Sequence, residues 1–416
     1  MIRYKSILLA LLFIPAVVTF GSKESRIEKK VRRVHEHVIT IDSHTDTPLR
    51  LSSKGFDIRQ RHDPVKDHSK IDFPRMKEGG LDAAFFAVFV SQGKRTPAAN
   101  EKAEDRAIAL FDTIHKVVAR CSDIAGLAMT SADARALKKQ GKTAVFIGME
   151  NGYPIGKDID LVNVYHELGA RYITLCHTKN NDLCDSSTDT TEHNGLSEFG
   201  KNVVLYMNRL GMMVDVSHIS DKSFYDVLAI THSPVIASHS CARAICNNPR
   251  NMDDKMLKAI ARNGGVIQMC ILSDYVKTPA PNPKRDSAGK AFQRKYPAFE
   301  NLSEEEMKKC REEWNVIDEK YPEKLATVSD VADHIDHIVK VAGIRHVGIG
   351  TDFDGGGGVE GCFDVSQMDN ITRELLSRGY TVSQLRKIWG GNLMRVMDKN
   401  VRIAKKLNKI CACGGK

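Results

Sequence analysis

The sequence predicts an α/β fold, a (β/α)8 TIM-type barrel. Eight short apolar runs recur along the chain, amphipathic segments of helical period lie between most of them, and only one long polar stretch interrupts the alternation. With 416 residues, 42% hydrophobic and 27% charged, the chain is globular and long enough for one large domain. Continuous apolar strands that alternate with helices indicate a parallel sheet, and eight such units favour a closed barrel.

The eight predicted strands are short and mostly apolar. They are residues 38–43, 81–90, 143–149, 172–176, 212–217, 233–238, 264–272 and 346–351. Helical period marks the segments 101–121 and 195–211, which precede the third and fifth strands, and Gly211 is placed as a C-cap. A third helix is expected over 329–343, before the last strand.

A polar insertion, residues 273–326, follows the seventh strand and is rich in proline and lysine. Within it, residues 301–321 read as an extra helix that begins with a capping box from Ser303 to Glu306. The insertion lies at the carboxyl end of the strands, where barrels of this type carry their active sites. Three interpretations stay open: surface decoration, a lid, or a contact between two copies in a homodimer.

The N-terminus predicts export. Residues 1–21 contain a basic start, about fifteen mostly apolar residues and small residues near Gly21, which is typical of a cleaved signal peptide. We therefore expect a periplasmic or secreted protein with one catalytic domain, 22–410, and a short tail, 411–416. Contact with a membrane is expected only if the N-terminal segment is not cleaved.

The composition of the chain argues against nucleic acid as a binding partner. The net charge of +9 comes without a basic block or interleaved aromatic residues, so no nucleic-acid binding is expected. Ten cysteines are scattered through the chain, which permits disulfides in an exported protein without predicting their pairing.

Polar side chains stand at the ends of six of the predicted strands. They are His44 and Asp46 after the first, Glu150 after the third, His177 after the fourth, His218 after the fifth, His239 after the sixth, and Asp352 with Asp354 after the eighth. The carboxyl ends of barrel strands share one mouth, so these side chains are expected to converge.

Such a cluster points to metal ions. A single histidine is usually only hydrogen bonded, but several imidazoles and carboxylates crowded together are costly without a cation. His44 and Asp46, at positions i and i+2 of a strand, can bind one ion, and Glu150 can bridge to a second held by His218 and His239. Zinc is the default for such ligands, and two zinc ions can hold a bridging hydroxide for hydrolysis.

Two further histidines, His334 and His337, are predicted to be structural. They lie on the helix that precedes the last strand and so fall away from the mouth.

The ordered motifs IDSHTD, GMEN, TLCHT, VDVSH, ASHS followed by NNPRN, and GIGTDFDG resemble those of the renal or membrane dipeptidase family. That family comprises binuclear zinc hydrolases with an amidohydrolase-like barrel, and the likeness runs from about residue 38 to 400, nearest to exported bacterial members. The resemblance implies that His44 and Asp46 bind one zinc, that Glu150 bridges, and that His218 and His239 bind the second.

The resemblance also implies roles for three residues that bind or turn over substrate. His177 would orient the substrate and polarise its reacting centre, Arg250 would meet the substrate carboxylate, and Asp352 would carry the proton to the leaving amine. These roles agree with the chemistry of a fixed guanidinium and of an acid beside metals.

Features of the mammalian family members do not transfer directly. Those proteins are GPI-anchored, disulfide-linked dimers, whereas this chain lacks a GPI tail and carries the insertion 273–326.

Three hypotheses for function follow. The first is a zinc dipeptidase for free dipeptides that tolerates a D-residue at the C-terminal position. The second is another binuclear amidohydrolase, acting on N-acyl amino acids or β-lactams. The third, a non-catalytic binding protein derived from the barrel, has no need for the complete ligand set and Asp352.

Overall fold

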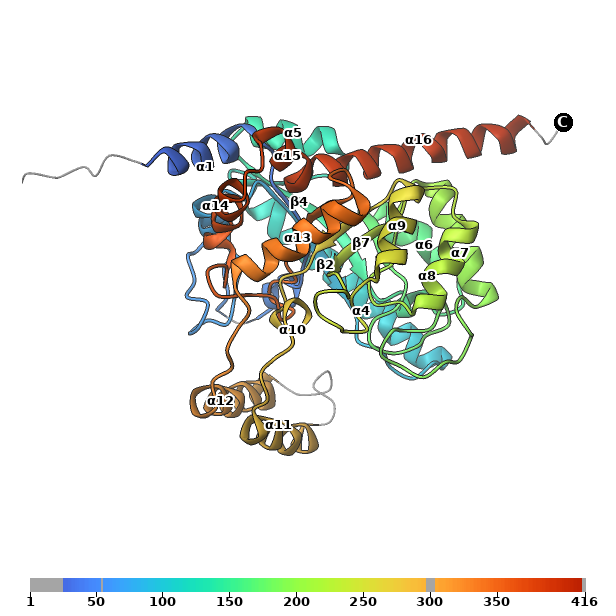
Figure 1. Ribbon diagram of the computed structural model, residues 1–416. Coiled ribbons are helices and arrows are strands. Elements are labelled where there is room, and N and C mark those ends of the chain that lie inside the picture. Colours follow the sequence, from blue (N-terminus) through green and yellow to red (C-terminus); the bar gives the residue numbers. More distant parts are fainter. Residues whose placement is uncertain (1–24, 54, 297–303, 414–416) are drawn as a thin grey trace, which may run out of the picture.

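The computed structural model describes residues 25–53, 55–296 and 304–413 (Figure 1). The predicted signal peptide, residues 1–21, lies outside the described residues, as does Ser303 of the predicted capping box. Among the described helices, none is long and apolar enough to cross a membrane.

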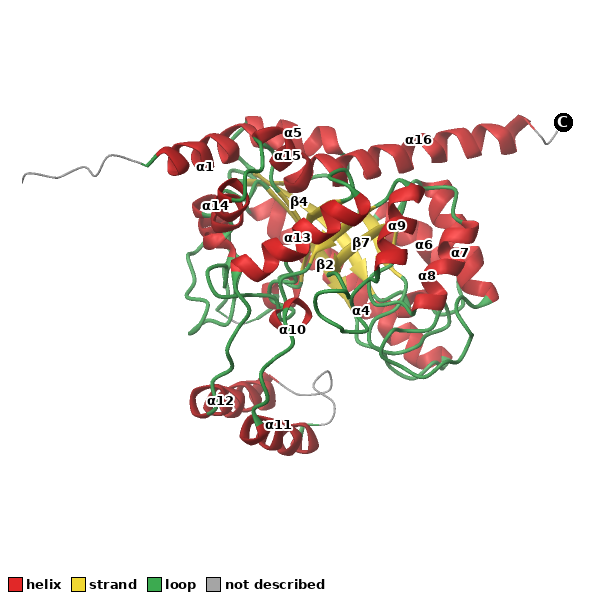
Figure 2. Ribbon diagram, in the orientation of Figure 1, coloured by secondary structure: helices red, strands yellow, loops and turns green. Residues whose placement is uncertain are grey.

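The core of the molecule is a barrel of eight parallel strands, which confirms the predicted fold class. Neighbouring strands follow the order β1-β2-β4-β5-β6-β7-β8-β9, and the short β3 pairs with β4 off this path. Figure 2 shows the strands at the centre with helices around them. Their bounds are β1 Ile41–Thr45, β2 Ala83–Phe89, β3 Ala125–Leu127, β4 Thr143–Glu150, β5 Ala170–Thr174, β6 Met213–Asp215, β7 Ile236–Ser240, β8 Val266–Met269 and β9 Val347–Ile349.

The barrel closes between its first and last strands, just beyond β9. The Asp352 amide donates to the His44 carbonyl at 3.1 Å, and the Asp46 amide donates to the Phe353 carbonyl at 2.9 Å. The buried carboxylate of Asp42 accepts from the amides of His44 and Thr351 and so ties the two strands together. Closure therefore depends on the same short segments that carry predicted site residues.

The helices surround the barrel and cover its outer face. Their bounds are α1 Arg26–His37, α2 Pro48–Leu51, α3 Phe73–Glu78, α4 Pro97–Arg120, α5 Ser131–Lys139, α6 Asp160–Glu167, α7 Glu198–Leu210, α8 Asp221–Ile230, α9 Asp254–Asn263, α10 Ser273–Val276, α11 Pro283–Lys295, α12 Glu304–Lys320, α13 Val328–Ala342, α14 Asp369–Ser377, α15 Val382–Arg386 and α16 Asn392–Cys413. Three of them, α4, α7 and α13, confirm the helices predicted at 101–121, 195–211 and 329–343. Gly211 caps α7 in the left-handed conformation, with φ of 78°.

Two strands depart from the sequence pattern. The apolar run at 38–43 begins before β1 because Val38 is the C-cap of α1, so the first strand starts at Ile41. The short β3 was not predicted. It has only three residues, all paired with β4, and so short a segment shows no alternation of apolar and polar residues.

The insertion contains two helices in its outer part, where the sequence predicted one. The proline- and lysine-rich stretch holds α11, which begins with Pro283, a residue well suited to the first turn of a helix. The Phe292 ring lies 4.9 Å from that of Trp314, and Arg285 pairs with Asp318 at 2.7 Å, which holds α11 against α12. Figure 1 shows this hairpin standing off from the barrel beyond α10.

Alternate residues of the strands fill the barrel interior. The Phe85 ring stacks on Phe146 at 4.6 Å and lies 5.4 Å from Tyr172. From α16, Leu393 and Met397 join the same interior cluster and close the amino-terminal end of the barrel. This helix continues to Cys413, into the stretch that the sequence assigned to a tail. The carboxyl end of the barrel is thus the end left to carry a site.

The cysteines whose side chains are described form no disulfide. These eight of the ten in the sequence are free and buried: Cys121, Cys176, Cys184, Cys241, Cys246, Cys270, Cys310 and Cys362.

The close approach of Gly148 to Tyr172 gives a test of the barrel interior. A Cβ at Gly148 would lie 2.1 Å from Cζ of Tyr172, so Gly148→Ala must displace that ring. We expect the free energy of unfolding, measured by urea titration, to fall by about 1–3 kcal/mol, the usual cost of overpacking a core. Gly289→Ala is the control, because its Cβ would meet nothing within 4 Å in α11. Equal stability of the two variants would contradict this account.

Candidate metal centre and active site

The predicted site residues come from the carboxyl ends of six barrel strands, as the sequence predicted. Several of these strand ends adopt a left-handed backbone that residues other than glycine rarely use. Positive φ angles occur at Asn151 (73°), His218 (70°), Asp352 (62°) and Asp354 (66°). Such conformations cost free energy and cluster at functional sites, where the surrounding fold enforces them.

Glu150 lies at the centre of the cluster, and its two carboxylate oxygens face different partners. Oε2 lies 3.4 Å from Nε2 of His44. Oε1 lies 2.9 Å from Nε2 of His218 and 3.5 Å from Nε2 of His239. One carboxylate therefore contacts imidazoles from three other strands.

The remaining acidic and imidazole groups extend this cluster on both sides. Asp46 Oδ2 lies 3.7 Å from His44 Nε2, and Asp352 joins these two residues in a group whose ligand atoms lie within 4.8 Å of one another. On the other side, His177 Nε2 lies 3.9 Å from Glu150 Oε1, with its ring 4.4 Å from that of His218. The structure thus brings seven of the eight predicted strand-end side chains together. The eighth, Asp354, instead accepts hydrogen bonds from the Thr47 hydroxyl at 2.8 Å and the Lys70 amide at 2.6 Å.

Arg250 lies beside the cluster on the segment that follows β7. It is only 4% exposed, and its Nη2 donates to the His239 carbonyl at 3.2 Å. The guanidinium lies over the Tyr275 ring at 5.3 Å, and its Nε has no hydrogen-bond partner among the described residues. Arg250 is therefore a buried cation at the site with a donor to spare.

Burial and mutual charge set the protonation of the cluster. Burial lowers the pKa of His218 and His239 well below the usual histidine value, and the Arg250 charge lowers both further. Burial alone would raise the pKa of Glu150, but His44 and His177 outweigh it and hold that pKa well below the usual range. Neutral imidazoles around an ionised carboxylate are the protonation states that metal ligands require.

His44 has the opposite tendency. Burial lowers its pKa, but Tyr172 and Glu150 together raise it well above the usual value. A cation at Glu150 would compete with that proton, so metal binding here should release it.

Two hydroxyl groups fix the orientation of the ligand imidazoles. The Tyr172 hydroxyl donates to the Ser43 carbonyl at 3.1 Å, so at 2.8 Å it must accept from Nδ1–H of His44. Likewise, the Ser238 hydroxyl donates to Asp215 at 2.6 Å and accepts from Nδ1 of His239 at 2.8 Å. Both contacts direct Nε2 toward Glu150, as the hydrogen-bond partners of metal-binding imidazoles commonly do.

The sequence analysis did not single out these supporting residues. Tyr172, Asp215 and Ser238 all lie inside the runs that were read as apolar strands. A signal was available, since an acidic residue such as Asp215 within an apolar strand is costly unless it is hydrogen bonded. Asp215 accepts hydrogen bonds from Thr174, Ser238 and the Ser217 amide.

The donor set fits divalent metal ions. His44 Nε2 and Asp46 Oδ1 are buried and have no hydrogen-bond partner among the described residues. Nε2 of His218 and Nε2 of His239 lie 2.8 Å apart, and both face the same carboxylate. Buried nitrogen and oxygen atoms that converge in this way satisfy the ligand preferences of zinc and similar ions.

The two histidines predicted to be structural lie outside the cluster. His334 accepts from the Ala242 amide at 3.0 Å and bonds to the Val276 carbonyl at 2.7 Å. His337 pairs with Asp254 at 2.7 Å. Their nitrogens serve to join α13 to its neighbours.

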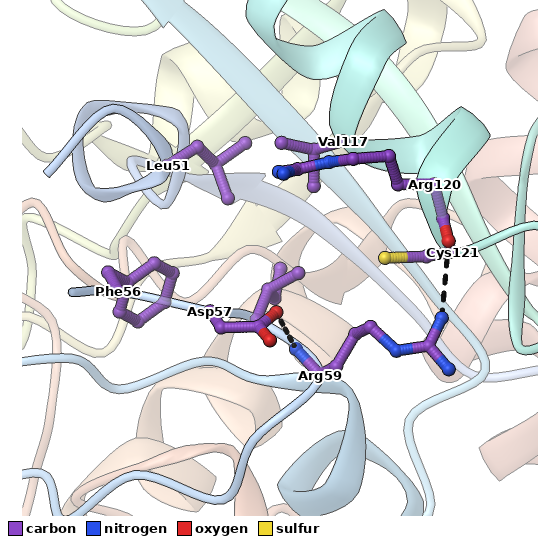
Figure 3. A pocket seen from close by; sticks show the side chains of 8 residues that line it. Leu51, Phe56, Asp57, Arg59, Val117, Arg120 and Cys121 are labelled. Carbon is purple, nitrogen blue, oxygen red and sulfur yellow. Dashed lines mark hydrogen bonds between the residues drawn. The ribbon is translucent and has the colours of Figure 1, made fainter. Parts of the chain in front are cut away.

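A separate hollow of about 230 Å³ lies between the segment that follows β1 and the end of α4 (Figure 3). Figure 3 shows the Arg59 side chain reaching the Arg120 carbonyl, and the same guanidinium binds both oxygens of Asp123 at 2.7 Å. The Arg59 cation of this hollow is therefore already paired, and no cluster of potential metal ligands among the described residues includes a residue that lines it.

The chain is similar to a known protein family and to curated proteins. The family model described as membrane dipeptidase, peptidase family M19, matches residues 28–410. Dipeptidase aclJ from Aspergillus oryzae is 31% identical over 352 residues, covering 83% of this chain and 73% of its own length.

Solved structures share the fold. The probable dipeptidase PvdM from Pseudomonas aeruginosa superposes with a TM-score of 0.78 at 28% identity, covering 91% of this chain and 99% of its own. A metallopeptidase from Rhodobacter sphaeroides, solved with a phosphinate mimic of the dipeptide L-Ala-D-Ala, gives a TM-score of 0.70 at 23% identity, covering 87% of this chain and 99% of its own.

The Tyr172 contact predicts a specific defect in metal binding. Tyr172→Phe removes the acceptor for Nδ1–H of His44, so we expect zinc affinity, measured by competition with a chelating dye, to fall about 10- to 100-fold. The matched control is Tyr165→Phe, which loses an equally buried hydroxyl that bonds to the Pro154 carbonyl at 3.0 Å. Both variants should lose about 1 kcal/mol of stability. If they bind zinc equally well, Tyr172 has only a packing role.

Proposed function

This chain belongs to the membrane dipeptidase family, peptidase family M19, and we propose that it uses two zinc ions to cleave free dipeptides. Membership makes it a metal-dependent hydrolase of peptide bonds. The finer proposal rests on the two carboxylate oxygens of Glu150, which face different imidazoles. Oε2 faces His44, whereas Oε1 faces His218 and His239.

In this proposal His44 and Asp46 would hold one ion, His218 and His239 would hold the other, and Glu150 would serve as a ligand to both. Two zinc ions at such a site would polarise the scissile carbonyl and supply a nucleophile from water at neutral pH.

Arg250 gives the site its preference for short substrates. In a dipeptide, the free carboxylate belongs to the residue that follows the scissile bond. A cation fixed beside the proposed metal ligands can therefore bind this carboxylate while the scissile bond lies at the metal site. The buried guanidinium of Arg250 has this position, and a charge-assisted contact with a carboxylate is its natural use.

His177 and Asp352 are proposed to act on the reacting groups. His177 is neutral, because burial lowers its pKa, and its ring nitrogen can donate a hydrogen bond to the substrate near the scissile carbonyl. Burial raises the pKa of Asp352 well above the usual carboxyl range. A neighbouring cation would lower that pKa toward the working pH, where Asp352 can take a proton and return it to the leaving amine.

The proposal includes tolerance of a D-residue at the C-terminal position. Arg250 would bind the carboxylate of that residue and not its side chain. The contact therefore does not require the L configuration. The Rhodobacter sphaeroides structure that shares this fold holds a mimic of L-Ala-D-Ala, which makes that dipeptide the natural probe.

We also propose that the protein works outside the cytoplasm, with residues 1–21 as its signal peptide and 22–410 as its catalytic domain. The support is the sequence pattern at the N-terminus and the start of the family match at residue 28.

The carboxylate anchor predicts how activity depends on the substrate terminus. Wild-type protein should release amino acids from L-Ala-L-Ala and L-Ala-D-Ala but not from their C-terminal amides. Arg250→Met should lower kcat/KM for the free dipeptides about 100-fold, the usual cost of losing a buried charged contact. The control Arg95→Met removes another arginine of the mouth, which pairs with Glu192 at 2.7 Å, and should change kcat/KM less than about 3-fold.

Two outcomes would overturn this assignment. If the amides are cleaved as well as the free dipeptides, Arg250 does not anchor a carboxylate. If N-acetyl amino acids turn over faster than dipeptides, the site belongs to another amidohydrolase activity.

Metal removal tests the two-ion proposal. Dialysis against a chelator should abolish dipeptide hydrolysis, and added zinc should restore it as the metal content, measured by mass spectrometry, reaches two ions per chain. Glu150→Gln should bind at most one ion tightly and lose more than about 1000-fold in kcat, because its neutral amide cannot serve two cations. Undiminished turnover by metal-free protein would refute the proposal.

A further inference from the structure

The end of the barrel opposite the active site carries many exposed basic side chains. Figure 1 shows α1, α5 and α16 along one edge of the molecule and the hairpin of α11 and α12 at the opposite edge. On α1, Lys29, Lys30 and Arg33 are exposed, and on α16 Lys405, Lys406 and Lys409 are exposed. We call the surface formed by these three helices the basic face.

Hydrogen bonds join the three helices into one surface. Lys138 of α5 donates to the carbonyls of His35 and Val38 at the end of α1, at 2.9 and 3.0 Å. At the start of α5, the Ser131 hydroxyl donates to Asp398 of α16 at 2.6 Å. The basic side chains of α1 and α16 are therefore held in a fixed arrangement.

Acidic residues on these helices are fewer than the basic ones. Glu28 pairs with Arg373 and Glu36 pairs with Arg32, so Asp133 of α5 and Asp398 of α16 are the acids of these helices without an ion-pair partner in the described part of the chain. Within the described part of the chain, Lys405, Lys406 and Lys409 have no ion-pair partner, so their charges are available to an external anion.

The same end of α16 also exposes an apolar side chain. Ile410 is 68% exposed, more than any other large apolar residue in the described ranges. A helix that combines lysines with exposed apolar side chains is typical of segments that lie at a lipid–water interface. A nucleic acid would be matched better by exposed aromatic residues among the basic ones.

The order of the segments along the chain also favours contact between this face and a bilayer. The apolar residues of the N-terminal segment end at Phe20, and α1 begins at Arg26, so the fold is entered at the basic face. In the export proposed above, on which this point rests, this end of the domain follows directly after the signal peptide.

From these observations we propose that the basic face docks on an anionic lipid bilayer through lipid phosphate groups. Docking persists after residues 1–21 are removed, and it turns the mouth of the barrel away from the membrane. Substrate then reaches the metal site from the aqueous side, and the hairpin of α11 and α12 projects toward that side.

Vesicle binding by the metal-loaded chain 22–416 tests the proposal. The family match begins at residue 28 and the first described helix at Arg26, so this chain contains the whole fold. We expect co-sedimentation with vesicles of equal parts phosphatidylglycerol and phosphatidylcholine, no binding to pure phosphatidylcholine, and loss of binding as NaCl is raised from 50 to 500 mM.

Charge-reversal variants locate the surface. The triple variant Lys405→Glu, Lys406→Glu, Lys409→Glu should lower the vesicle partition coefficient at least 10-fold, because each basic residue near an anionic surface contributes about 5-fold. The matched control, Lys284→Glu, Lys290→Glu, Arg294→Glu, makes the same change in net charge on exposed residues of α11 and should bind as wild type does. Both variants should keep wild-type dipeptide hydrolysis in solution, which confirms folding.

Three results would overturn the proposal. They are failure of the wild type to bind anionic vesicles at 50 mM NaCl, equal loss of binding in the two triple variants, and tighter binding to a DNA duplex than to vesicles at 150 mM NaCl. None of these depends on peptidase activity, so the docking surface and the proposed function can fail independently.

Discussion

The rest of the site depends on the contacts that the buried carboxylate of Glu150 makes. It lies among His44, His218 and His239, which come from three other strands, at distances of 2.9 to 3.5 Å. A buried charge must be compensated, and here the compensation comes from imidazoles and from the cations they can hold. Because the strands that bring these groups together also form the barrel, the geometry of this cluster is a consequence of barrel closure.

A layer of hydrogen bonds connects this charged mouth to the apolar interior. Tyr172 packs against Phe85 within the barrel while its hydroxyl orients His44. Asp215 and Ser238 do the same for His239 from the next strands. Asp42, whose pKa burial raises to about 6, joins the first and last strands beside the metal ligands. The barrel core therefore supports the site directly and does not merely fill space beneath it.

The two ends of the barrel have different surfaces and different roles. At the amino-terminal end, α16 closes the interior with apolar residues and presents lysines outward. At the carboxyl end, the strands finish in charged groups, and the insertion adds a helical hairpin. Docking through the basic face, as proposed, would therefore turn the mouth of the barrel to the opposite side.

The sequence alone determined the barrel and the residues that converge at its mouth, because both follow from local rules. Apolar runs alternate with helices, and His44, Glu150, His218 and His239 stand where those runs end. The ordered motifs at the strand ends, together with the one around Arg250, pointed to the family and to the expected substrate. Only the tertiary structure showed how the two oxygens of Glu150 are divided, which nitrogen of each imidazole is free, and how Tyr172 and Asp215 support them. It also placed α16 across the closed end and revealed α11 inside a stretch that read as polar loop. These features depend on contacts between residues far apart in the chain, and periodicity along a sequence carries no information about such contacts.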